Sequence, residues 1–135
     1  MKLRLLSIPF VALGLFSGSA PIFAHHSFAA EYDANKSVTL TGTVTKVEWM
    51  NPHARFYIDV KNEKGNVENW EMELGSPNGL MRAGWNRNSL KVGDVVTVYG
   101  NLAKDGSKLA NARKVVLADG TPVLGASSAD NGATK

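Results

Sequence analysis

The alternation of apolar and polar residues predicts that most of this chain forms β-strands. Between Val38 and Trp49, apolar side chains alternate with a run of threonines, the period of a strand with one buried face. The apolar phase shifts after Val44, which predicts a β-bulge or sharp coil, and Gly42 is the expected bending point. A strand of this kind can serve both sheets of a small barrel.

The same reasoning predicts four further strands and one short helix. The strands are expected in the ranges 54–61, 70–74, 95–102 and 109–117. Ser76 followed by Pro77 is typical of a helix start, and Gly84 of a helix end, so a helix is predicted from Pro77 to about Ala83. We therefore predict an all-β protein with one short helix, a five-stranded OB-like barrel in the order β-β-β-α-β-β. A small split β-sandwich is the alternative.

The first 24 residues have the layout of a cleavable signal peptide. Lys2 and Arg4 precede an apolar run of about a dozen residues, too short for the roughly 20 that span a bilayer. With cleavage after Ala24, we expect a periplasmic or secreted protein with no membrane span. The predicted organisation is signal peptide 1–24, extended lead-in 25–37, barrel 38–119 and flexible tail 120–135.

Charge and cysteine content exclude several kinds of site. Without Lys2 and Arg4, thirteen basic side chains face twelve acidic ones, and no basic cluster remains. We therefore expect no nucleic-acid binding. The sequence contains no cysteine, which excludes disulfides and thiolate metal ligands.

The three histidines of the chain suggest a metal site. If His25 begins the mature chain, its α-amine and imidazole offer two adjacent nitrogen ligands, and His53 can supply a third. Cu(II) favours planar nitrogen sets of this kind. We predict a copper site at His25 and His53, with His26 as a further ligand and zinc as the second choice of metal. The alternative is that the histidines are structural, with His53 hydrogen-bonding its own loop.

The lead-in decides whether His25 can reach His53. At roughly 3.3 Å per residue, the first predicted strand and the lead-in each span about 40 Å, so contact requires a stretched and docked lead-in. Phe28 and Tyr32 are the expected docking side chains. Tyr32 and Asp33 would then lie near the metal as accessory groups.

A metal-free binding module is the alternative function. Arg55, Tyr57, Glu71 and Glu73 are predicted on the outer, solvated face of the second and third strands. This mixed polar patch could hold a small polar ligand, an oligosaccharide, a peptide or an envelope protein. No catalytic constellation is recognisable, so we do not expect an enzyme.

Several motifs together resemble a known family. They are residues 25–33 (HHSFAAEYD), 40–42 (LTG), 49–53 (WMNPH), 84–85 (GW) and 91–94 (KVGD). Their combination is similar to a family of small exported bacterial proteins that is catalogued only as a domain of unknown function. The resemblance covers nearly the whole mature chain. It implies an exported, OB-like single domain and no established activity.

Overall fold

The longest strand, β1 (Tyr32–Glu48), is the centre of the fold because it pairs with two different strands. The computed structural model describes residues 27–123. The other elements are α1 (Phe28–Glu31), β2 (Arg55–Lys61), β3 (Val67–Glu73), α2 (Pro77–Arg82), β4 (Val95–Ala103), β5 (Leu109–Leu117) and β6 (Pro122–Val123). The second half of β1 pairs with β2, and most of its length before that pairs with β4, both antiparallel.

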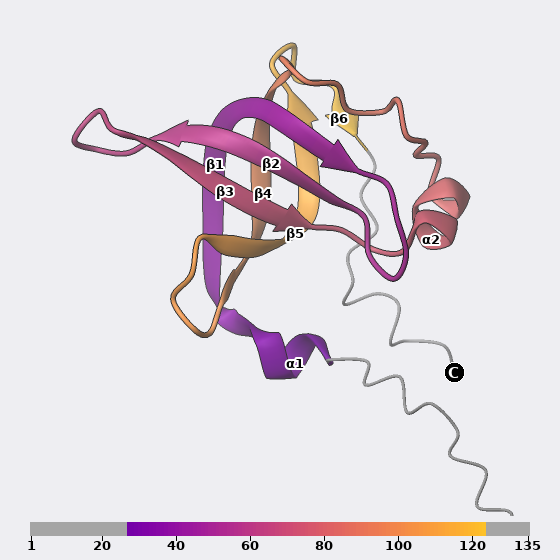
Figure 1. Ribbon diagram of the computed structural model, residues 1–135, viewed down its shortest axis with the longest axis horizontal. Coiled ribbons are helices and arrows are strands. Elements are labelled where there is room, and N and C mark those ends of the chain that lie inside the picture. Colours follow the sequence, from indigo (N-terminus) through magenta and orange to yellow (C-terminus); the bar gives the residue numbers. More distant parts are fainter. Residues whose placement is uncertain (1–26, 124–135) are drawn as a thin grey trace, which may run out of the picture.

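The remaining pairings close the strands into a ring. β2 pairs with β3 and β4 with β5, and a short parallel pairing of β3 with β5 joins the two ends. Figure 1 shows this ring, with the β2–β3 hairpin extending to one side and α2 at the other end of β3. The predicted class is confirmed: the protein is all-β, with a short helix between the third and fourth strands of an OB-like ring.

The predicted bulge in β1 is confirmed. The register of β1 against β2 shifts between Val44 and Lys46, which is where the apolar phase changes in the sequence. Gly42 lies just before this shift, and a Cβ added there would come within 2.4 Å of the Asp59 backbone oxygen. The two strands can therefore approach so closely only because residue 42 has no side chain.

Substituting Gly42 with alanine is expected to lower the free energy of unfolding by about 2 kcal/mol, because the backbone of β2 must move away. Chemical denaturation measures this change. Ser37→Ala, at an exposed position of the same strand, is the control and should change stability by less than about 0.5 kcal/mol. Equal stability of the Gly42 variant and the wild type would contradict the close approach.

The interior of the ring is apolar, as the alternation predicts. Phe56, Ile58, Met72 and Leu80 are fully buried among the inward side chains. Trp85 is also buried, whereas Trp49 and Trp70 pack partly against the core. The predicted helix begins at Pro77 as expected, and the Ser76 hydroxyl accepts a hydrogen bond from the Gly79 N–H at 3.2 Å. Within residues 27–123, no helix is long and apolar enough to cross a membrane.

The lead-in differs from the extended segment that the sequence predicts. Phe28–Glu31 forms one helical turn, and β1 already begins at Tyr32. Residues 34–37 are exposed, so this part of the strand lacks the alternation that would have revealed it. A short sixth strand, β6, also forms at Pro122–Val123 within the range predicted as a flexible tail.

Candidate functional site

His53 is held in the β1–β2 loop with one ring nitrogen engaged. Its Nδ1 lies 3.1 Å from the Leu74 carbonyl oxygen. Because a carbonyl only accepts, the neutral ring carries its proton on Nδ1 and presents the lone pair of Nε2. The backbone of the loop is fixed at the same place, since Leu74 donates to the Ala54 carbonyl and Ala54 donates to that of Gly75. About a fifth of the His53 side chain is exposed (22%).

Glu73 lies at the centre of a cluster of polar side chains next to His53. Its carboxylate is 4.0 Å from His53 Nδ1 and 3.5 Å from the Arg55 guanidinium. The prediction that Glu73 is solvated is wrong, because only 4% of the residue is exposed. Glu73 lies opposite Arg55 of β2 on one side and opposite Asn111 of β5 on the other, so β3 is covered by strands on both sides at this position. A buried carboxylate requires a cationic or hydrogen-bonding partner, and Arg55 provides one.

Tyr32 connects the lead-in to this cluster. The residue is 1% exposed, and the Phe28 ring stacks on it with centroids 5.5 Å apart. Burial, and then the nearby Glu73 carboxylate, raise the pKa of the Tyr32 phenol well above its usual range. Its hydroxyl is nonetheless without a well-formed hydrogen bond in the described part of the chain. Phe28, Tyr32, Glu73 and His53 thus form a continuous series of neighbours.

The residues of the predicted polar patch meet across β2 and β3. Arg55 is paired in register with Glu73, and Tyr57 with Glu71. Arg55 also forms an ion pair with Glu71 at 2.9 Å. The Tyr57 hydroxyl donates to Glu48 at 3.1 Å, and burial together with this bond raises the pKa of Tyr57. The charged side chains of this patch are therefore already paired with one another.

Only one of the three predicted metal ligands lies in the part of the chain that the structure describes. His25 and His26 lie outside the described residues, and His53 lies within them. Within residues 27–123, no three histidine, aspartate or glutamate side chains form a metal-binding group. The Asp33 carboxylate accepts the N–H of Asn35, and no hydrogen bond or ion pair joins Asp33 to His53 in this part of the chain.

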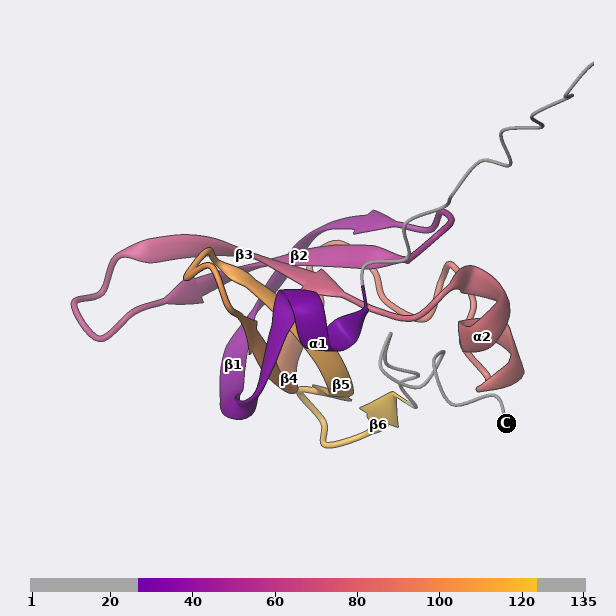
Figure 2. The ribbon, with the colours of Figure 1, turned by 90° about the horizontal axis from the view of Figure 1, so that it is seen from below.

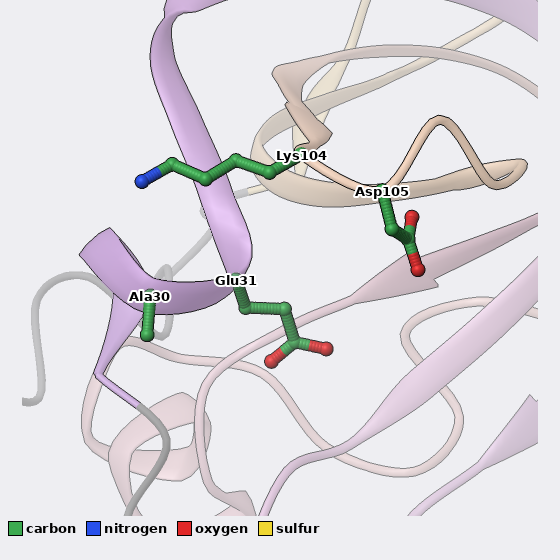
Figure 3. A pocket seen from close by; sticks show the side chains of 4 residues that line it. All are labelled: Ala30, Glu31, Lys104 and Asp105. Carbon is green, nitrogen blue, oxygen red and sulfur yellow. The ribbon is translucent and has the colours of Figure 1, made fainter.

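A hollow of about 300 Å³ lies where α1 meets the β4–β5 turn, and Figure 3 shows the residues that line it. The Glu31 and Asp105 carboxylates extend to one side and the Lys104 amine to the other. Lys104 holds α1 in place, since its backbone N–H donates to the Glu31 carbonyl and its amine donates to the Ala29 carbonyl. Figure 2, a view from below, shows α1 at this end of the ring. The lead-in is therefore fixed to the barrel from Ala29 onward.

Sequence reasoning identified His53, Arg55, Tyr57 and Glu71 as site candidates, but it did not find how Glu73 and Tyr32 are joined. The sequence predicts Glu73 in solvent, and it predicts Tyr32 as a docking side chain of the lead-in and an accessory group near the metal, without naming the residue that Tyr32 contacts. Tyr32 lies seven residues after His25, and this spacing does not reveal which strand Tyr32 contacts. The only signal in the sequence was a pair of aromatic residues, Phe28 and Tyr32, in an otherwise polar segment.

Comparison with known proteins gives a family but no function. A model described as "Family of unknown function (DUF6152)" matches residues 12–112. No curated protein matches the chain. A solved crystal structure of TiaS in complex with an isoleucine tRNA and ATP has 26% sequence identity and a TM-score of 0.45 over 60% of this chain. The chain spans 18% of the length of that protein, and a TM-score this low does not establish a common fold. On the family match, which covers most of its length, the chain belongs to the family of unknown function DUF6152.

Proposed function

We propose that this protein is exported to the periplasm or the medium and binds Cu(II) there, through His25 as the first residue of the mature chain and through His53. His26 is a further candidate ligand. The α-amine and ring of His25 would give two nitrogens, and Nε2 of His53 a third, a set that suits Cu(II) better than other divalent ions. Carriage or sequestration of copper is the role that such a site supports.

The observation that carries the proposal is the orientation of His53. Histidines that bind metals usually donate the other ring N–H to a carbonyl or carboxylate, which fixes the tautomer and the direction of the lone pair. His53 has this arrangement, with Nδ1 directed at the Leu74 carbonyl and Glu73 at 4.0 Å. Within residues 27–123, Nε2 has no hydrogen-bond partner and remains available to a ligand.

The docked lead-in supports the second half of the site. Phe28 stacks on Tyr32, and Tyr32 lies against Glu73 beside His53. His25 precedes Phe28 by three positions, a span of at most about 10 Å. The ring of strands brings the start of β1 close to the end of β3. The lead-in therefore does not need to span the length of β1, about 40 Å, for His25 to approach His53.

The metal-free alternative has weaker support. A ligand at Arg55, Tyr57, Glu71 and Glu73 would need to displace ion pairs that these residues already form with one another. Breaking such an ion pair beside a buried carboxylate costs more free energy than a single new contact with a ligand provides. We therefore favour copper.

The proposal is tested by Cu(II) titration of protein whose first residue is verified as His25 by mass spectrometry. In one variant the α-amine of His25 is acetylated, and another is His53→Ala. Each should bind Cu(II) at least about tenfold more weakly, because each removes a nitrogen ligand. Electron paramagnetic resonance should show fewer nitrogens coupled to the copper in both. Unchanged affinity in both variants would rule the site out.

The matched control is His26→Ala, which leaves the α-amine, the His25 ring and His53 in place. A loss equal to that of His53→Ala would make His26 a ligand, whereas no loss would restrict the site to His25 and His53. A parallel zinc titration compares the two metals. Circular dichroism of each variant shows that a lost affinity does not arise from unfolding.

A further inference from the structure

A second hollow, unrelated to His53, lies on the outer face of the sheet. It encloses about 370 Å³ and is open to solvent. Its lining comes from four strands: Thr41 and Thr43 of β1, Asp59 and Lys61 of β2, Val67 of β3, and Val95 of β4. A volume of this size accommodates a small molecule.

Pairing registers place these side chains on one face. Thr43 lies opposite Asp59 on one side and opposite Val95 on the other, and Lys61 lies opposite Val67. Residue 42 between the two threonines is the glycine that lets β1 and β2 approach closely. The hollow therefore belongs to the rigid part of the fold, next to the bulge of β1.

The charges in the hollow are of both signs and lie at fixed positions. The Asp59 carboxylate is oriented by the Asn69 side chain, which donates to Oδ1 at 2.8 Å. Lys61 forms no ion pair within residues 27–123. Because Asp59 and Lys61 are two residues apart on a strand, their side chains share a face with Cα atoms about 6.6 Å apart. Together they present an acceptor and a cation to the same ligand.

Two aliphatic side chains flank these charges. Val67 is 59% exposed and Val95 is 45% exposed, so both leave apolar surface in water that a ligand could cover. The Asp59 carboxylate would repel a ligand that carries only a negative charge, and the Lys61 amine would repel a ligand that carries only a positive charge. A ligand that carries both charges and a short aliphatic group matches Asp59, Lys61 and one of the flanking valines.

We infer that this hollow binds a small zwitterion with a branched aliphatic side chain, of the kind of a free aliphatic α-amino acid. The ligand carboxylate pairs with Lys61 and the Thr43 hydroxyl, and its ammonium pairs with Asp59. The aliphatic side chain covers Val95, which lies opposite Thr43. This inference is independent of the copper proposal, because no residue is shared between the two sites.

The test compares three ligands of closely matched carbon skeleton by NMR titration of isotopically labelled protein. They are L-leucine, 4-methylpentanoate, which lacks the ammonium, and 3-methylbutylamine, which lacks the carboxylate. Leucine should shift the amide signals of residues 41–43 and 59–61 in a saturable way, with a roughly millimolar dissociation constant. Each of the other two should bind at least about tenfold more weakly.

Two variants locate the site. Asp59→Asn and Lys61→Met should each weaken leucine binding at least about tenfold. Lys64→Met, which removes the same charge from the exposed β2–β3 turn, should leave it unchanged. The inference is overturned if leucine gives no saturable shift at about 50 mM, if all three ligands bind alike, or if the Lys64 variant loses as much affinity as the Lys61 variant. Copper binding by His53 would be unaffected by any of these results.

Discussion

Replacing Tyr32 with alanine is expected to lower the free energy of unfolding by about 4 kcal/mol. The side chain is almost completely buried, and the Phe28 ring of α1 stacks on it. Its removal leaves a cavity beside Glu73 and takes away the surface on which the Phe28 ring stacks. Denaturation in guanidinium chloride, followed by tryptophan fluorescence and circular dichroism, measures the loss.

Tyr32→Phe separates the ring from the hydroxyl. Because the hydroxyl has no well-formed hydrogen bond in the described chain, its removal should change stability by less than about 1 kcal/mol in either direction. A loss in the phenylalanine variant as large as that in the alanine variant would show that the hydroxyl, and not the ring, anchors the lead-in. Stability of the alanine variant close to that of the wild type would show that the lead-in is not anchored there.

The fold could be predicted from the sequence wherever one face of a strand is buried and the other exposed. The threonine run of β1, the bulge after Val44 and the start of α2 at Pro77 each have a local physical cause that is visible in the sequence. The first residues of β1 could not be found in this way. Residues 34–37 are exposed. Only Ser37 among them is paired in register with β4, and the Asn101 amide donates to the carbonyls of Asp33 and Ala34.

The candidate site was predictable only where its residues lie on strands that are adjacent in the sequence. Residues on adjacent strands, such as Arg55 and Glu73, can be placed together from strand alternation and a hairpin. The contact of Glu73 with Tyr32 involves instead a segment more than 40 residues earlier in the chain. No local pattern encodes that contact, because it exists only after the ring has closed through β3 and β5.

Arg55 is expected to be the second residue on which stability strongly depends. Its guanidinium contacts Glu71 at 2.9 Å and the buried Glu73 at 3.5 Å. Arg55→Met keeps much of the side-chain volume but leaves the Glu73 carboxylate buried without its cation. We expect the free energy of unfolding to fall by about 3 kcal/mol. The control is Arg113→Met, an exposed position on β5, which should cost less than about 0.5 kcal/mol.

The double variant Arg55→Met/Glu73→Leu tests the cause of that loss. If the cost of Arg55→Met is that of an uncompensated buried charge, removal of the charge should restore most of the stability, to within about 1 kcal/mol of the wild type. A strictly additive double variant would mean that Arg55 and Glu73 stabilise the fold independently of one another. Recovery would also show that the carboxylate beside His53 is not needed for folding. Its retention at a buried position, next to a histidine with a free ring nitrogen, would then be better explained by the function of the site than by stability.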